Sequence, residues 1–188
     1  SGSSRYATAT AIAEELGSNG PVFLVSGENF PDALSAASYA AVLGAPILLV
    51  RGNEVPEEVL AAISALNPST VYVIGGTAVI SDGVFNQLPN PQRISGSDRY
   101  GTAVALAEFF AEGLTEFYVA SGQNASGGVD ALTGAALAAK RGTGILLVGN
   151  TLPDSVAEFL GKRIQNAFIL GGKSAVSAEV ARAIEEAL

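Results

Sequence analysis

The sequence contains the same pattern twice, and this internal repeat limits the possible folds more than any other feature. The start, residues 1–9, returns at 95–103, and the segment 74–81 returns at 170–177. Shorter matches lie between them in the same order, pairing 25–27 with 120–122, 32–34 with 130–132, and 47–50 with 145–148. Ordered matches of this kind indicate two tandem copies of one structural unit. We place the first copy at residues 1–92 and the second at residues 93–188.

Each copy alternates helical and strand patterns. In the first helix, apolar residues recur at the spacing of one helix face, at Ala9, Ile12, Ala13 and Leu16. The strands are short continuous apolar runs at 22–25, 47–50, 71–74, 117–120, 145–148 and 168–170. Continuous apolar strands separated by helices favour a parallel sheet that is covered on both faces. The predicted fold class is therefore α/β, with two tandem units, each a short parallel sheet flanked by helices.

The helices that begin at Asp32 and Asp130 have almost no polar face. Alanines recur on all sides of both, at 33, 36, 37, 40 and 41 and at 131, 135, 136, 138 and 139. Small residues all around a helix suit a buried position. We therefore expect these two helices to form much of the interface between the copies. Each aspartate is expected to have a structural role, as an acid that caps free N–H groups at a helix start.

Composition excludes several classes of enzyme. The chain has no Cys and no His, which removes thiolate chemistry, Ser-His-Asp hydrolysis and most zinc sites. No carboxylate pair recurs in both copies. We therefore predict a protein that is not an enzyme and that uses neither a cofactor nor a metal. The net charge of −8 argues against a nucleic-acid partner, and no apolar run approaches the ~20 residues of a membrane span.

Four segments together resemble the type 2 cell-wall-binding repeat. They are Gly96–Ala103, Ser26–Leu34, Pro46–Leu49 and Ile74–Ser81. The resemblance implies a Rossmann-like unit on secreted surface proteins of Gram-positive bacteria, commonly three in tandem, often beside an amidase or adhesin domain. It also implies non-covalent anchoring on anionic wall polymers. The sequence departs from the pattern at Ser4, where the family has Asp, and at Gly144, where it has Pro.

The resemblance implies a non-catalytic anchoring module that binds an anionic cell-wall polymer, located outside the cell at the wall or surface. A structural assembly unit of a surface layer or filament, built by further copies of the repeat, is the alternative. A phosphate-binding enzyme is a weaker one. The segment Gly171-Gly172-Lys173-Ser174 resembles the end of a phosphate loop, but that motif requires Gly at position 167, where this chain has Ala167. Because the chain does not begin with Met, we expect it to be a piece of a longer protein.

Candidate binding residues follow the strands, because open α/β sheets bind ligands at the carboxyl edge. The predicted ligand-binding set is Arg5, Arg51, Arg99, Ser121, Gly122, Gln123, Gly171, Gly172, Lys173 and Ser174. Gly75 and Gly76 are assigned a structural role in a tight turn, beside the two aspartates. Arg5 and Arg99 begin helices, where the dipole disfavours a cation. Each therefore needs a partner, either a carboxylate such as Asp32 or Asp130 or an anionic ligand.

Charge is distributed unevenly between the copies. Residues 1–92 contain two basic and eight acidic residues, and residues 93–188 contain eight basic and ten acidic residues. At equivalent positions, Glu28 becomes Gln123 and Thr77 becomes Lys173. Further cations in the second half are Lys140, Arg141, Lys162 and Arg163. We expect an anionic polymer to favour the second copy.

Overall fold

The computed structural model describes residues 2–17, 20–123 and 127–188. The first unit consists of α1 (Arg5–Leu16), β1 (Val22–Ser26), α2 (Pro31–Val42), β2 (Ile47–Val50), α3 (Glu57–Leu66), β3 (Val71–Ile74), α4 (Asp82–Phe85) and β4 (Pro91–Ile94). Its four strands are parallel in the order β2-β1-β3-β4. The predicted α/β class is confirmed for this unit.

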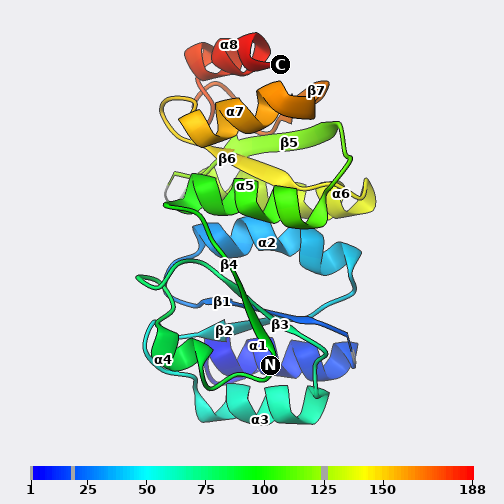
Figure 1. Ribbon diagram of the computed structural model, residues 1–188, viewed down its shortest axis with the longest axis vertical. Coiled ribbons are helices and arrows are strands. Elements are labelled where there is room, and N and C mark those ends of the chain that lie inside the picture. The colour runs from blue at the N-terminus through cyan, green and yellow to red at the C-terminus, as the bar shows by residue number, and fades with distance from the viewer. Residues whose placement is uncertain (1, 18–19, 124–126) are drawn as a thin grey trace.

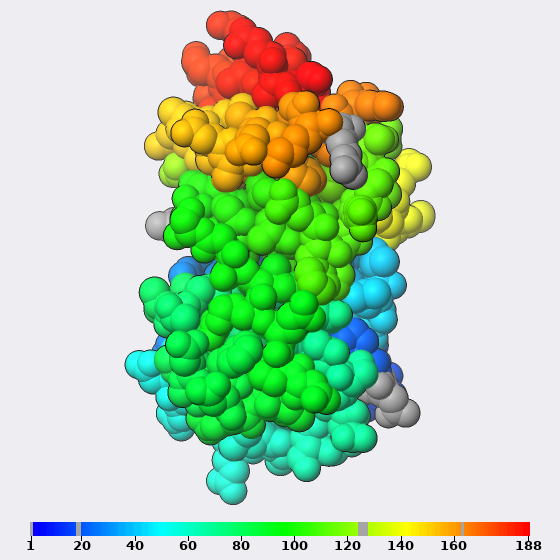
Figure 2. Space-filling model, in the orientation of Figure 1, coloured from blue at the N-terminus to red at the C-terminus, as the bar shows by residue number. Residues whose placement is uncertain are grey.

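The second unit repeats this order without a fourth strand in the described residues. It consists of α5 (Arg99–Phe110), β5 (Glu116–Ser121), α6 (Gly127–Lys140), β6 (Ile145–Val148), α7 (Asp154–Arg163), β7 (Asn166–Ile169) and α8 (Ala178–Ala187). The strands are parallel in the order β6-β5-β7. The two units are stacked along the long axis, with α3 at one end and α8 at the other (Figures 1 and 2).

Equivalent helices begin in equivalent ways. The Ser4 hydroxyl accepts a hydrogen bond from the N–H of Ala7, and the Asp98 carboxylate accepts from the N–H groups of Tyr100 and Gly101. Both side chains therefore cap the first turn of their helix. The departure at Ser4 keeps this function, because serine and aspartate cap with similar strength.

The strand β4 joins the two units. It lies across the predicted boundary between residues 92 and 93, and it pairs with β3 of the first sheet. Arg93 of β4 donates hydrogen bonds to the carbonyl oxygens of Gly75 and Ile80, at 2.8 and 3.0 Å, and to the Asp82 carboxylate at 3.2 Å. The chain thus completes the first sheet before it enters α5.

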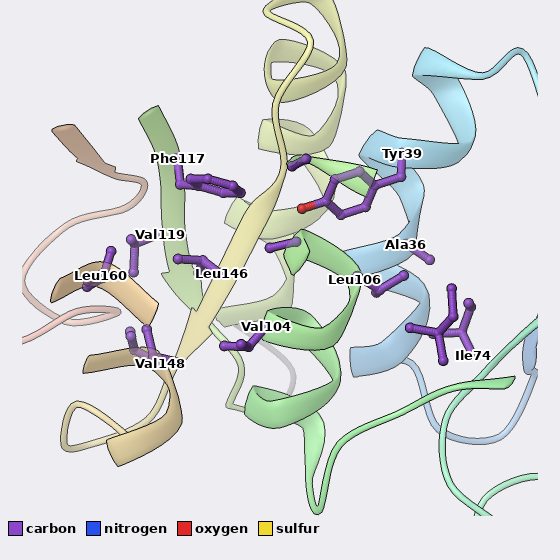
Figure 3. Packing of buried hydrophobic residues seen from close by; sticks show 14 of the residues in the cluster. Ala36, Tyr39, Ile74, Val104, Leu106, Phe117, Val119, Leu146, Val148 and Leu160 are labelled. Carbon is purple, nitrogen blue, oxygen red and sulfur yellow. The ribbon is translucent and has the colours of Figure 1, made fainter. Parts of the chain in front are cut away.

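The two alanine-rich helices form the centre of the interface between the units, as predicted. α2 packs against α6, and also against α5 and β6. Among the described residues, α6 makes no comparable contact with α1 or β2, so the interface is not two-fold symmetric. One hydrophobic cluster extends across both units, and Figure 3 shows the Tyr39 ring of α2 pointing toward the second unit, while Ala36 lies on the side of α2 near Ile74.

Tyr39 explains the glycine at position 144. The tyrosine is 3% exposed and its ring stacks on Phe110 of α5, with 5.5 Å between the centroids. Its hydroxyl lies so close to Gly144 that an added side-chain carbon would overlap it. The first unit has Pro46 at the corresponding position before β2. Gly144 is therefore the residue that admits a side chain of the first unit into the second.

Candidate functional site

A serine fixes the turn after the first strand of each unit. The buried Ser26 hydroxyl accepts hydrogen bonds from the N–H groups of Glu28 and Asn29, at 3.1 and 3.2 Å. The buried Ser121 hydroxyl accepts one from the N–H of Gln123 at 3.3 Å. Ser121 is thus satisfied within its own turn, and this geometry favours a structural role for it.

The helix-start arginines hold the same turns. Arg5 donates a hydrogen bond to the carbonyl oxygen of Gly27, and Arg99 donates one to that of Gly122 at 2.7 Å. Neither arginine forms an ion pair within the part of the chain that the structure describes. The expected carboxylate partner is therefore wrong as a direct pair: each arginine is bound by a backbone carbonyl.

The tyrosine that follows each arginine covers the same glycine. A side-chain carbon at Gly27 would lie 2.7 Å from the Tyr6 ring, and one at Gly122 would lie 3.1 Å from the Tyr100 ring. The recurrence of Arg-Tyr together with Ser-Gly in both copies thus has one physical cause. The arginine donates a hydrogen bond to the glycine carbonyl, and the tyrosine ring occupies the space in which a side chain on that glycine would lie.

The aspartates lie against the glycine turns that follow β3 and β7. Gly75 has φ of 112° and Gly171 has φ of 98°, a backbone conformation that favours glycine. A side-chain carbon at Gly75 would lie 2.7 Å from the Asp32 carboxylate, and one at Gly171 would overlap the Asp130 carboxylate. Each aspartate therefore packs against a turn of its own unit.

Asp32 differs from Asp130 because it lies at the interface. It is 5% exposed, and this burial raises its pKa to about 6 from the usual 3.8. The positive charge of Arg99 and a hydrogen bond from the Thr102 hydroxyl, both in the second unit, oppose the rise without cancelling it. The field of Arg99 thus acts on the carboxylate of the other copy.

This pKa predicts that Asp32 makes folding less stable as the pH rises. In the unfolded chain the carboxyl ionises near pH 3.8, and in the folded chain near pH 6, so the stability present below pH 3.8 is lost as the pH passes 6. The loss is about 3 kcal/mol, at ~1.4 kcal/mol for each pH unit between the two values. Asp32→Asn should abolish it, which urea unfolding of both proteins at pH 4 and pH 7 measures. Thr102→Val removes a hydrogen bond that lowers the Asp32 pKa, so this variant should lose more stability between pH 4 and pH 7 than the parent does. Equal pH dependence of Asp32→Asn and the parent would contradict the assignment.

The cation at the first carboxyl edge is already neutralised. Arg51 follows β2 and pairs with Glu54 at 2.9 Å, and its guanidinium lies 5.2 Å from the centre of the Tyr6 ring. The Glu28 carboxylate accepts a hydrogen bond from the N–H of Gly52 at 3.2 Å. Two acids therefore accompany this arginine, which leaves little attraction for an added anion.

The cations of the second unit lie at two different edges. Lys173 follows β7 and, with Gly171, Gly172 and Arg182, lines a hollow at the carboxyl edge. The cations at 140 and 141 instead end α6, beside the residues that begin β5. The cations of the second copy therefore do not form one positive region.

The other two cations that we count in the second half, at 162 and 163, belong to α7. Lys162 lies near the end of α7 and pairs with Glu158 at 3.1 Å and Glu108 at 3.9 Å. It is thus largely neutralised, and it lies at the edge where the strands begin. The Arg163 side chain lies outside the described residues.

Comparison with known proteins identifies the family. The family model described as Cell wall binding domain 2 (CWB2) matches residues 1–85 and 93–181. The chain belongs to this family. Both repeats are therefore cell-wall-binding modules and not catalytic domains, and the chain belongs at the bacterial cell wall or cell surface.

Named relatives show how widely the likeness extends. The N-acetylmuramoyl-L-alanine amidase LytC of Bacillus subtilis (strain 168) is 33% identical over 98% of this chain, and the amidase enhancer of that organism is 31% identical over 99%. The chain spans 37% and 26% of their lengths. Cwp6 and Cwp8 from Clostridium difficile are each 28% identical, with TM-scores of 0.88 and 0.84 over 99% of this chain, which covers 31% and 33% of theirs.

The structure brings the candidate residues of the two CWB2 repeats together in three groups. Arg5 and Arg51 lie around Tyr6 at the edge of the first sheet. Arg99 meets the turn at 121–123, and the segment 171–173 lines the separate hollow beside α8. Ser174, the last candidate, is exposed in the turn before α8. Gly76 follows the strained Gly75, and a side chain there would meet open space.

Sequence reasoning missed three contributors to these groups. Tyr6 and Tyr100 recur at the same place in each CWB2 repeat, and that recurrence was the available signal. Arg182 corresponds to the uncharged Asn86 in the first unit, and only its position one turn into α8 places it beside Lys173. Within the described ranges, no helix is long and apolar enough to span a membrane, and no three acidic side chains gather as metal ligands would.

Proposed function

We propose that this CWB2 pair binds an anionic cell-wall polymer, chiefly through the carboxyl edge of its second repeat. The family match over both repeats supports binding to the wall. Two positive side chains support both an anionic ligand and the carboxyl edge of the second repeat as its site. Lys173 and Arg182 are exposed at that edge, and neither is ion-paired among the described residues. The first edge carries instead Arg51 with its acidic partner.

Sedimentation of the protein with purified walls tests the proposal. Walls that retain their anionic polymer should carry the protein into the pellet, and walls stripped of it should not. Raising the salt concentration should weaken binding, because exposed charges are screened over ~10 Å at 0.1 M salt. Equal binding to stripped and intact walls would contradict an anionic ligand while leaving wall binding itself in place.

Lys173 is predicted to be a principal contact. Lys173→Thr gives the second edge the residue found at Thr77, and we expect about two- to fivefold weaker polymer binding with a flatter salt dependence, as for the loss of one exposed charge contact. Thr77→Lys should strengthen binding by a similar factor. Titration of soluble wall polymer at several ionic strengths measures both effects.

Lys140 offers a matched control for that titration. It is also exposed, but it ends α6 at the opposite edge. Lys140→Thr makes the same change in net charge and should leave polymer affinity almost unchanged. If Lys140→Thr and Lys173→Thr weaken binding equally, net charge and not the carboxyl edge governs the interaction.

A second candidate function, assembly by further copies of the repeat, is supported by the asymmetry of the interface. The first unit uses α2 to contact α5, α6 and β6, whereas α6 leaves Val129, Leu132 and Leu137 exposed. Interfaces that are not two-fold symmetric leave a free half on each partner. A molecular mass that rises with concentration in sedimentation equilibrium would favour this function over anchoring by a monomer.

A further inference from the structure

A buried polar cluster crosses the interface between the two repeats. Asp32, at the start of α2, packs on the Gly75 turn of its own unit and accepts a hydrogen bond from the Thr102 hydroxyl of α5. Thr102 is 2% exposed, and the same hydroxyl accepts a hydrogen bond from the N–H of Gly96 at 3.1 Å. A hydroxyl group can do both, because it has one donor and two acceptor positions. The carboxyl group of the first repeat is thus connected to the segment that leads into the second.

Arg99 interacts both with that carboxyl group and with the carboxyl edge of the second repeat. It precedes Thr102 by three residues, so the two side chains lie on one face at the start of α5. Its positive charge acts on Asp32, and its guanidinium donates a hydrogen bond of 2.7 Å to the carbonyl oxygen of Gly122. Gly122 belongs to the turn after β5, at the sheet edge that also carries Lys173. One cation therefore connects a buried acid of the first repeat to the proposed binding edge of the second.

Among the described residues, Arg99 is the group whose charge acts on the Asp32 carboxyl. The elements that pack against α2 are α5, α6, β1, β3 and β6, and the three strands carry no charged side chain within their described residues. Glu108 of α5 pairs with Lys162, and Asp130 of α6 packs on a turn of its own unit. The other titratable side chains on α2 and on these elements are Tyr39, Tyr72, Tyr100 and Lys140. The net charge of the Asp32 and Arg99 side chains together therefore depends on whether Asp32 holds a proton.

We propose that Asp32 is a proton-controlled switch for the carboxyl edge of the second repeat, and that it acts through Arg99. When the Asp32 carboxyl is protonated, the two side chains together carry one positive charge, which attracts an anionic polymer. When it is ionised, the two side chains together are neutral, and the edge attracts the polymer less. This inference rests on the proposed function, because it takes that edge as the polymer site.

Burial sets the pH at which the switch acts. It raises the Asp32 pKa to about 6, against the opposing effects of Arg99 and Thr102. The carboxyl is therefore mostly protonated at pH 5 and mostly ionised at pH 7.5. Protonation and polymer binding favour each other by the same factor, because coupling between two binding events is reciprocal. The polymer should consequently bind more tightly in acid.

The amide signals of the turn after β5 test the switch in the protein without polymer. The chemical shifts of the Gly122 and Gln123 N–H groups should titrate with a midpoint near pH 6, because Arg99 contacts this turn and responds to the charge of Asp32. Asp32→Asn, which cannot ionise, should remove that titration. Two-dimensional NMR spectra recorded from pH 4.5 to pH 8 measure both proteins. Signals of this turn that stay constant over the range in the parent would overturn the proposal.

Titration of soluble wall polymer at pH 5 and pH 7.5 tests the consequence for binding. At pH 5 the parent and Asp32→Asn should bind alike. At pH 7.5 the parent should bind roughly three- to tenfold more weakly than the variant, as for one charge acting across a partly buried site. Comparing the two proteins at the same pH removes the titration of the polymer and of the other acids. Asp130→Asn is the matched change in the second repeat, and it should differ from the parent by one constant factor at both pH values.

Arg99→Gln tests whether the arginine transmits the effect. In that background Asp32→Asn should no longer change the affinity at pH 7.5, whereas an effect of net charge alone would persist. An affinity ratio of the parent to Asp32→Asn that is equal at both pH values would overturn the proposal and leave polymer binding in place. Absence of binding at both pH values would instead refute the proposed function, and the amide titration would then decide whether Asp32 controls the turn.

Discussion

Replacing Gly144 by alanine should destabilise the protein by about 3 kcal/mol, at the upper end of the cost of overpacking a core. The added carbon overlaps the Tyr39 hydroxyl, and neither side has room to move. Tyr39 is 3% exposed and stacked on Phe110, while the Gly144 carbonyl accepts a hydrogen bond from the N–H of Tyr118 in β5. Urea unfolding should show a lower midpoint with an unchanged slope, as expected for a loss of stability alone.

A double-mutant cycle with Tyr39→Leu separates this clash from other effects of the alanine. Leucine is the residue at the equivalent position, Leu137, and it has no hydroxyl to meet the new carbon. Tyr39→Leu alone leaves a cavity and lowers the free energy of unfolding. The double variant should lose less stability than the two single variants lose together. Gly76→Ala is the control, because its new carbon meets open space, and it should change stability by no more than about 0.5 kcal/mol. Simple additivity of Gly144→Ala and Tyr39→Leu would refute the contact.

The architecture was predictable because it depends on patterns that are local in the chain. Continuous apolar runs such as 47–50 and 145–148 show which segments are buried strands, and their recurrence shows that the chain folds as two similar units. The alanines of α2 and α6 also indicate burial on all sides. A helix buried on all sides in a two-unit chain has few places to lie other than between the units. The position of α2 and α6 at the interface could therefore be predicted.

The partners of the arginines were not predictable in the same way. A carboxylate is a rare and visible partner in a sequence, whereas every residue has a carbonyl oxygen. Arg5 and Arg99 use such carbonyls, at Gly27 and Gly122, and no side-chain pattern marks them as acceptors. The fit of Tyr39 against Gly144 was hidden for a related reason, since it joins residues of different units.

The distribution of cations could have been predicted more fully than it was. Helices in a parallel α/β unit run opposite to the strands, so a cation near a helix end lies at the edge where the strands begin. Lys140 ends α6 and Lys162 lies in the last turn of α7, whereas Lys173 lies in the turn that follows β7. Sorting the charges by these positions, and not by halves of the chain, separates the two edges. The pairing of Lys162 with Glu108 could not be predicted in this way, because it depends on the packing of α5 against α7.

Adding a third repeat should tighten binding to wall polymer by about 10²–10⁴-fold, which is the gain expected when several weak sites act on one scaffold. The two-repeat chain has exposed apolar residues where a third repeat would pack. Leu132 of α6 is 60% exposed and Ile12 of α1 is 57% exposed. These helices are the counterparts of α2 and α5, which pack together at the existing interface. A copy of residues 86–188, which includes the strand that leads into α5, supplies a second edge like that of Lys173. Titration with long and short polymer measures the gain, which only a polymer long enough to reach both edges should show.

The control for that experiment is a three-repeat protein in which the added copy carries threonine at the position of Lys173. Its fold and its packing against the first two repeats are retained, because Lys173 is exposed and lies in the turn before α8. If the gain comes from several sites acting together, this protein should bind almost as weakly as the two-repeat chain. If instead a third repeat acts by stabilising the others, both three-repeat proteins should bind equally tightly. Equal affinity of the two-repeat and three-repeat proteins for long polymer would refute multivalent binding altogether.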